Sequence, residues 1–333
     1  MNKARAARAF TPAALEAVKA FPIDADLVEL VSVSENATFR VTDRSDGGAY
    51  VLRLHRPGYH TLEELNSERV WTRALADAGI AVPIPVKTRE GDDYTCVAVP
   101  SLGEQRQVGM TRWIEGELLS DVLEANGDVA VLEHYFEQLG AIEAAMHNQS
   151  SGWRPPPTFR RHAVDADGLM GDTPVWGPFW EHPALAAAEG RLFLETRDRI
   201  RGAMDRYGRH ASNYGVIHAD LHAGNLLANG DRLTVIDFDD SAFGWHLYDI
   251  AVALVHQQRS PHFDAIQRAF VRGYRARRGL DEEALSLLPM FLLVRGLAQI
   301  GWLHQRPEIN ASRTIRGALE RLCAQCEALE LRC

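Results

Sequence analysis

The sequence predicts an α+β protein with two lobes: a mostly antiparallel sheet that carries one inserted helix, followed by a larger, mainly helical part. Two patterns support this prediction. Short apolar or alternating segments bounded by turn residues dominate residues 1–115, whereas apolar residues at helical spacing dominate residues 116–333. We therefore expect two domains with these boundaries, because 333 residues are enough to build two cores.

The N-terminal pattern predicts two helices and five strands. Thr11 and Pro12 open the first helix, over residues 11–20, because Pro is favoured at the first helical position. The second helix, over residues 62–79, has helical apolar spacing and ends at Gly79. The expected strands cover residues 27–34, 37–42, 50–55, 93–99 and 107–114.

The C-terminal pattern predicts long helices around one short hairpin. A strand enters a polar loop over residues 215–227, and a second strand covers residues 233–236 after an Asn-Gly-Asp turn. Residues 152–183 are rich in Pro, Gly and Trp, which predicts a long irregular insertion. The expected helices cover residues 129–147, 185–207, 245–257, 264–277, 282–304 and 311–330.

Composition narrows the class of protein. The formal net charge of −9 argues against a nucleic-acid partner. No apolar run approaches the ~20 residues of a membrane span, and no apolar signal segment follows the basic N-terminus. The four cysteines form no zinc pattern, so we expect reduced thiols and a cytoplasmic protein, with its oligomeric state left open.

Three oxygen-bearing side chains gather at the expected hairpin. Asp220 and Asn225, which are separated by four residues, follow its first strand, and Asp237 follows its second strand. A carboxylate can orient an acceptor hydroxyl, and hard oxygen ligands can hold Mg²⁺ on phosphates. The pattern therefore favours phosphoryl transfer, with the three side chains near one point.

This stretch resembles the aminoglycoside phosphotransferase and choline kinase branch of the kinase-like superfamily, near the homoserine kinases and stress-response kinases, whose loop reads His-x-Asp-x-x-x-x-Asn. The resemblance implies a protein kinase-like bilobal fold, with ATP and Mg²⁺ as cofactors. It makes Asp220 the catalytic base or hydroxyl positioner, and Asn225 and Asp237 the metal ligands. It also assigns the nucleotide to the N-terminal lobe, which ends in a hinge, and the acceptor to the helical lobe.

The expected nucleotide site departs from the usual kinase pattern at two places. The glycine-rich turn is absent, and residues 34–39 stand in its place with small polar side chains. On the third strand, Arg53 occupies the usual Lys position, which keeps the charge but changes its shape. By resemblance, the residues that bind the nucleotide or support its site are Ser34, Asn36, Thr38, Val51, Arg53, Glu68, Thr111, Arg112 and Ile114.

The sequence gives weaker evidence for the residues that bind the phosphate acceptor. His222 lies near the expected acceptor, and Asp239 and Asp240 could complete a metal shell or hold a cationic acceptor. Asp249 resembles the structural Asp that caps the catalytic-loop backbone. Only nine residues separate Asp239 from Asp249, which is too short for a peptide-docking segment and favours a small acceptor molecule.

We therefore expect an ATP-dependent O-phosphotransferase that acts on an alcohol group of a small metabolite. Homoserine, choline or ethanolamine, an aminoglycoside and a sugar are all open as acceptors. One alternative is a Ser/Thr protein kinase of the bacterial stress-response type. Another is a nucleotide-binding pseudokinase with a regulatory role, which Arg53 favours.

Overall fold

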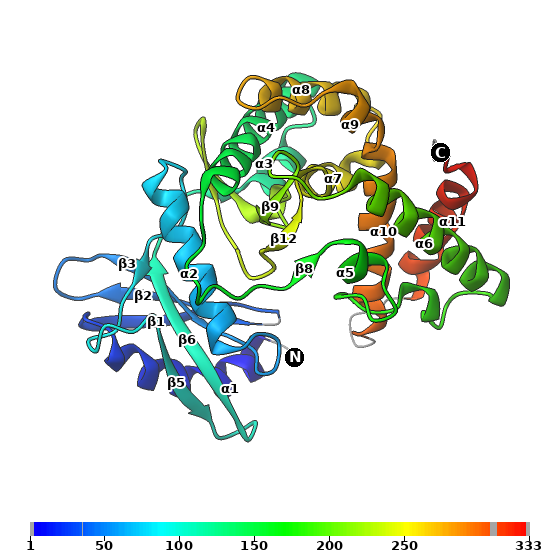
Figure 1. Cartoon of the computed structure of the whole chain (residues 1–333). Helices are drawn as coiled ribbons and strands as arrows, with labels where there is room; N and C mark the ends of the chain where they lie inside the picture. The colour runs from blue at the N-terminus through cyan, green and yellow to red at the C-terminus, as the bar shows by residue number, and fades with distance from the viewer. Residues whose placement is uncertain (1–2, 35, 307–311, 331–333) are drawn as a thin grey trace. The chain divides into compact units, whose positions relative to one another are not determined.

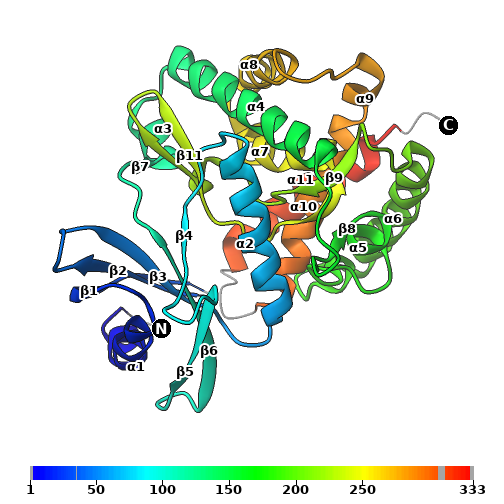
Figure 2. The ribbon, with the colours of Figure 1, turned by 60° about the vertical axis from the view of Figure 1, so that its left-hand side comes forward.

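A computed structural model describes residues 3–34, 36–306 and 312–330 (Figures 1 and 2). The chain separates into two compact units, and each combines segments that are far apart in sequence. The first unit consists of Met1–Glu117, Pro155–Arg160 and Leu227–Asp239. The second consists of Leu118–Arg154, Arg161–Leu226 and Asp240–Cys333. Glu35 of the expected phosphate turn and Cys333 lie outside the described residues.

The first unit contains an antiparallel sheet in the order β1-β2-β3-β6-β4, with β5 paired to β6. Its strands are β1 (Ala25–Val33), β2 (Ala37–Asp43), β3 (Ala49–Leu54), β4 (Pro85–Val86), β5 (Tyr94–Val99) and β6 (Glu104–Arg112). Helix α1 (Lys3–Ala17) and a short 3-10 turn, Val18–Ala20, pack on one face, and α2 (Leu62–Asp77) lies on the other side (Figure 1). This arrangement confirms the sheet with an inserted helix.

Successive side chains of a strand point to opposite faces of the sheet, so β3 contributes to a core on one face and presents its other side chains on the opposite face. Leu52 and Leu54 of β3 are fully buried in the core beneath α1, together with Phe39 of β2. The alternate β3 residues, Val51 and Arg53, therefore point to the opposite face of the sheet. The expected functional strand is thus built as the sequence indicated.

Helix α1 begins eight residues earlier than the sequence predicted, at Lys3 rather than Thr11, and Pro12 lies inside it. The preceding residues are rich in Ala and Arg, which favour helix. Ala6, Phe10 and Ala13 bury one face against the sheet. The burial of this face offsets the cost of an interior Pro.

A second sheet, in the order β11-β10-β7, contains only the second strand of the expected hairpin. The first expected strand, β9 (Tyr214–Ile217), pairs instead with β12 (Ala242–Trp245) in another sheet, and β11 pairs with β10, a strand that the sequence did not predict. Its strands are β7 (Glu117–Leu118), β10 (Leu226–Asn229) and β11 (Arg232–Val235), and Gly230 in the turn has φ +57°. The end of β11 and the residues that follow it are bonded to and packed against other parts of the first unit. Val235 donates its N–H to the Ala81 carbonyl at 3.0 Å, and Phe238 packs edge-on against Trp71 of α2.

The second unit is mainly helical, as expected, with a small sheet in the order β8-β12-β9. The strands are β8 (Ala163–Val164), β9 (Tyr214–Ile217) and β12 (Ala242–Trp245). The helices are α3 (Leu119–Ala125), α4 (Val129–Gly152), α5 (Ala166–Met170), α6 (Ala187–Tyr207), α7 (His246–Val255), α8 (Phe263–Arg275), α9 (Glu282–Ser286), α10 (Leu288–His304) and α11 (Ser312–Ala328). Short 3-10 turns cover Phe179–Glu181, Ala223–Asn225 and His256–Arg259.

Two expectations for the second unit are wrong in detail. The helix expected over residues 282–304 is split into α9 and α10, because Pro289 lacks an N–H group and fits only the first turn of a helix. The insertion over residues 152–183 is not wholly irregular, since it contains β8, α5 and a 3-10 turn. Within the described parts of the chain, no helix is both long and apolar enough to cross a membrane. Cys96, Cys323 and Cys326 are free thiols.

Candidate active site

The predicted catalytic loop follows β9 in the second unit. A buried carboxylate holds this loop through hydrogen bonds from its main-chain N–H groups. Asp249 of α7 is fully buried, and its two carboxylate oxygens accept the N–H groups of His218 and Ala219 at 3.0 and 2.8 Å. Ala219 has φ +63°, a left-handed conformation that costs a non-glycine residue roughly 1–2 kcal/mol. The bonds to Asp249 hold this strained turn, which is the architectural role that the sequence indicated.

Asp220 and Asn225 meet within this loop. The Asn225 amide nitrogen donates to the Asp220 carboxylate at 2.9 Å and to its main-chain oxygen at 2.8 Å. Because that nitrogen is occupied, the amide oxygen of Asn225 is the atom left to face a cation. His222 Nε2 lies 3.6 Å from the same carboxylate, and its ring packs edge-on against His256.

Arg295 of α10 also holds Asp220, although it is not among the residues predicted from the sequence. Its guanidinium donates to the Asp220 oxygen that Asn225 does not hold. Burial alone would raise the pKa of Asp220, but His222 and Arg295 outweigh burial and lower this pKa well below its ordinary value. Asp220 is therefore an oriented, ionised carboxylate.

Arg53 and Asp237 meet in the first unit. Arg53 donates to an Asp237 oxygen at 2.8 Å, and its other terminal nitrogen lies 3.5 Å from Asp239. Burial alone would lower the pKa of Arg53, but these two carboxylates and Glu68 raise it above its ordinary value. Arg53 is thus a permanent cation on the sheet face where a nucleotide phosphate is expected.

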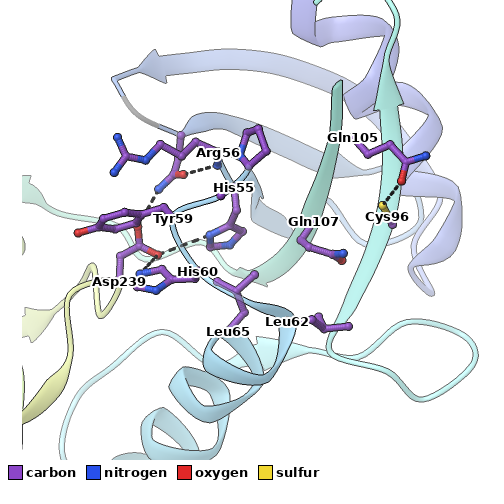
Figure 3. Close-up of a pocket in the computed structure, with 13 residues that line it drawn as sticks. His55, Arg56, Tyr59, His60, Leu62, Leu65, Cys96, Gln105, Gln107 and Asp239 are labelled. Carbon is purple, nitrogen blue, oxygen red and sulfur yellow. Dashed lines mark hydrogen bonds and ion pairs between the residues drawn. The ribbon is translucent and has the colours of Figure 1, made fainter. Parts of the chain in front are cut away.

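The Asp239 carboxylate organises the expected phosphate turn. Asn36 donates to Asp239 at 3.1 Å and accepts the N–H of Arg56 at 2.9 Å. Asp239 also lies 3.5 Å from His55 and 3.8 Å from His60, beside a cavity of about 220 Å³ (Figure 3). These contacts tie the turn, the end of β3 and Asp239 together.

The other expected nucleotide residues fall on neighbouring strands of the first unit. Thr38 lies opposite Arg53 in the β2–β3 ladder, and Val51 lies opposite Thr111 in the β3–β6 ladder. Ser34 donates its N–H to the Asn36 carbonyl at 3.2 Å. Arg112 ends β6, where its N–H donates to the Ile84 carbonyl at 3.0 Å, and Ile114 follows two residues later.

Glu68 of α2 is buried but differs from the expected arrangement. It forms an ion pair with Arg69 at 3.8 Å, and within the described ranges no ion pair joins it to Arg53, although its charge helps to raise the pKa of Arg53. The planar guanidinium of Arg53 reaches Asp237 and Asp239 instead. The planar fork of Arg53 thus faces two carboxylates at once, an arrangement that its shape favours over that of a Lys.

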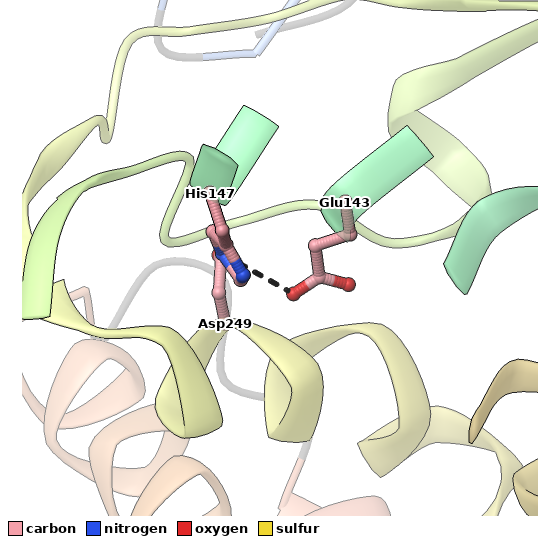
Figure 4. Close-up of side chains that lie close together, drawn as sticks. All are labelled: Glu143, His147 and Asp249. Carbon is pink, nitrogen blue, oxygen red and sulfur yellow. Dashed lines mark hydrogen bonds and ion pairs between the residues drawn. The ribbon is translucent and has the colours of Figure 1, made fainter. Parts of the chain in front are cut away.

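A second polar cluster lies beneath the catalytic loop. Glu143 and His147 of α4 lie beside Asp249, and all three side chains are fully buried (Figure 4). His147 Nε2 lies 3.3 Å from Asp249 and 3.9 Å from Glu143, while its Nδ1 lies 2.8 Å from the Tyr274 hydroxyl. Burial and the nearby Asp249 charge raise the pKa of Glu143 well above its ordinary value of 4.5.

We expect Glu143→Gln to make the protein increasingly more stable than wild type as pH rises. Folded wild type keeps a proton on Glu143 that the unfolded chain releases above about pH 4.5, so its unfolding free energy falls relative to the variant by about 1.4 kcal/mol per pH unit. This difference stops growing once the pH exceeds the folded-state pKa. Urea unfolding between pH 5 and 8 measures it, with Glu137→Gln, an exposed position on α4, as the matched control. Parallel stability curves for wild type and Glu143→Gln would contradict a protonated Glu143.

Comparison with known proteins identifies the family. The model of the phosphotransferase enzyme family matches residues 26–287. Amicoumacin kinase from Bacillus subtilis (strain 168) is 24% identical over 305 residues, which make up 89% of this chain and 85% of that protein. Homoserine kinase from Methylobacillus flagellatus is 28% identical over 280 residues, covering 82% of this chain and 77% of the relative.

Solved structures agree with these sequence matches. A microcompartment-associated aminopropanol kinase has a TM-score of 0.79 and 30% sequence identity, and the match covers 95% of each chain. An amicoumacin kinase solved with AMP-PNP and Ca²⁺ also has a TM-score of 0.79, at 22% identity, over 98% of this chain and 96% of that one. The latter similarity supports the fold alone.

These matches confirm the kinase-like fold and the family resemblance that the catalytic loop predicted. The matched region contains each of the residues predicted at the site, from Ser34 to Asp240. The chain therefore belongs to the phosphotransferase enzyme family and is an ATP-dependent kinase that phosphorylates hydroxyl groups of small molecules.

Proposed function

We propose that this enzyme transfers the γ-phosphoryl group of ATP to the hydroxyl of a small hydroxylated amine, such as an amino alcohol or a hydroxy amino acid. Two kinds of relative support this class. The aminopropanol kinase is similar over 95% of both chains, and homoserine kinases recur among the curated relatives. Aminopropanol and homoserine each carry one hydroxyl and one amino group.

The charges around Asp220 carry the proposal. In the second unit, Arg295 forms an ion pair with the Asp220 carboxylate, and its positive charge also acts on Asp240 and on the buried Asp249. A multiply charged aminoglycoside would favour a strongly acidic pocket, whereas this balance suits a singly charged amine or a zwitterion. His222 stands beside Asp220 and is the residue we propose to contact the acceptor.

The donor set suits a divalent cation. The oxygen of Asn225 is not engaged by Asp220, and Asp237 is bonded to Arg53 through only one of its oxygens in the described contacts. We propose that these two side chains bind Mg²⁺, because it prefers carboxylate and carbonyl oxygens. When bound, Mg²⁺ neutralises charge on the ATP phosphates.

We assign the remaining steps to side chains of this protein. The Asp220 carboxylate accepts the hydrogen bond of the acceptor hydroxyl and aims its oxygen at the γ-phosphate. Its lowered pKa makes it a weak base, and the loose transition state of phosphoryl transfer requires little proton removal before bond formation. Arg53 binds the phosphates from β3, and the Asn36 turn covers them with main-chain N–H groups.

A panel of acceptors tests the proposed class. ADP release should be fastest with 1-amino-2-propanol, ethanolamine or homoserine, and slower with choline, an aminoglycoside, a simple sugar or a generic protein. Phosphorus NMR should then show a phosphate monoester of the preferred amine. ADP release that is fastest with the aminoglycoside, the sugar or the protein would contradict the proposal.

A further inference from the structure

Arg295 reaches the catalytic loop from a distant part of the chain. It lies in the middle of α10, 75 residues after Asp220, and only 8% of its surface is exposed. Its Nη2 donates to Oδ1 of Asp220, while Asn225 holds Oδ2 at 2.9 Å. Both oxygens of the predicted catalytic carboxylate are therefore held, and their directions are fixed by two different elements.

Arg295 is itself held by an aromatic stack. Its guanidinium lies 5.6 Å from the ring centre of Trp176, and Trp176 stacks on Tyr248 with 6.1 Å between ring centres and 21° between planes. Burial raises the pKa of Tyr248 to about 12, so its hydroxyl stays protonated beside Arg295. A planar guanidinium can lie over a ring while its N–H groups donate in its own plane, a geometry that an ammonium group does not have.

The packing of α10 fixes this stack in place. Gly301 lies about 1.7 turns after Arg295, and a Cβ atom added to it would come within 2.3 Å of the Gly177 carbonyl oxygen. The helix therefore presses directly on the backbone beside Trp176. Through this contact, the insertion over residues 152–183 holds Trp176 in place beside Arg295. The sequence had suggested no definite role for this insertion.

We propose that Arg295 is a positioning residue, which holds the Asp220 carboxylate in the orientation that receives the acceptor hydroxyl. A carboxylate has about four lone-pair sites, so the bonds from Arg295 and Asn225 leave sites for the hydroxyl. Without Arg295, the half-buried carboxylate loses a charge-assisted bond and can rotate about its side-chain bonds. This inference rests on Asp220 as the group that orients the acceptor.

Substitution of Arg295 should separate turnover from nucleotide binding. We expect Arg295→Ala to lower kcat about 10- to 100-fold, the loss expected for one hydrogen bond to a charged group. The affinity for AMP-PNP with Mg²⁺ should stay within about twofold, because the proposed phosphate cation, Arg53, belongs to the other unit. The kcat of Arg295→Lys should lie between the values for wild type and Arg295→Ala. As a control, Arg272→Ala removes an exposed ion pair with Glu137 and should keep the kcat of wild type.

Two further measurements distinguish positioning from a general structural role. Added guanidinium ion should raise kcat of Arg295→Ala but not of Arg272→Ala or wild type. In an Asp220→Asn background, Arg295→Ala should cost little further activity, since its target is already altered. Wild-type kcat in Arg295→Ala, loss of nucleotide affinity parallel to kcat, or absence of guanidinium rescue would each overturn the proposal. A failure of Asp220 as the orienting group would show separately, as activity retained in Asp220→Ala.

Discussion

Asp220→Ala should lower kcat by about 10²- to 10⁴-fold, the range typical for loss of a positioned acid–base group. The carboxylate is oriented by Asn225 on one oxygen and by Arg295 on the other, and the substitution removes the group that both of them hold. Binding of AMP-PNP with Mg²⁺ should remain measurable, because Arg53 and Asp237 lie in the first unit, although Asn225 loses the bond that orients its amide. Steady-state kinetics and calorimetric titration measure the two quantities on the same preparation.

An exposed carboxylate provides the control for this substitution. Asp231 lies in the exposed turn between β10 and β11, and Asp231→Ala should keep wild-type kcat. Turnover near wild type in Asp220→Ala would remove the assigned role of Asp220. Loss of folding is checked by comparing the thermal unfolding midpoints of the two variants.

Arg53→Ala should weaken nucleotide affinity by about one to two orders of magnitude, or roughly 1.4–2.8 kcal/mol. The variant removes the cation that we assign to the phosphates. It also leaves Asp237 and Asp239 without the guanidinium that bridges them at 2.8 and 3.5 Å. Two adjacent carboxylates without that charge repel the anionic phosphates, so both effects act in the same direction.

The Arg53 experiment needs a control for loss of positive charge. Arg44 is an exposed arginine of the first unit that pairs with Asp26, and Arg44→Ala should leave the affinity for AMP-PNP unchanged. Arg53→Lys should retain more affinity than Arg53→Ala, because it keeps a cation on β3. An unchanged affinity in Arg53→Ala would show that Arg53 does not bind the phosphates.

Local patterns in the sequence were enough for most of the fold. Alternating segments predicted five of the strands in the first sheet, and β9, β11 and most helices were also expected. The start of α1 was missed because Thr11 and Pro12 are a strong local signal for a helix start, whereas the burial of Ala6 and Phe10 depends on the distant sheet. Packing against other elements decided the outcome there.

The candidate site also contains residues with local sequence signals and residues whose role depends on distant neighbours. Asp220, Asn225 and the turn at Asn36 carry local motifs, so the sequence could mark them. Arg295 could not be marked, because its role depends on a neighbour 75 residues away. Glu143 gave a weaker signal: a carboxylate on the buried face of a long helix is uncommon and could have pointed to the cluster around Asp249.

The most direct test of the account is a crystal structure of the enzyme with Mg²⁺ and AMP-PNP. We predict a Mg²⁺ ion within ~2.0–2.1 Å of both the Asn225 amide oxygen and an Asp237 carboxylate oxygen. Asp220 should not ligate the ion, and its carboxylate should remain bonded to Arg295. A metal–nucleotide complex held by other residues, with Asn225 and Asp237 away from the ion, would contradict the account.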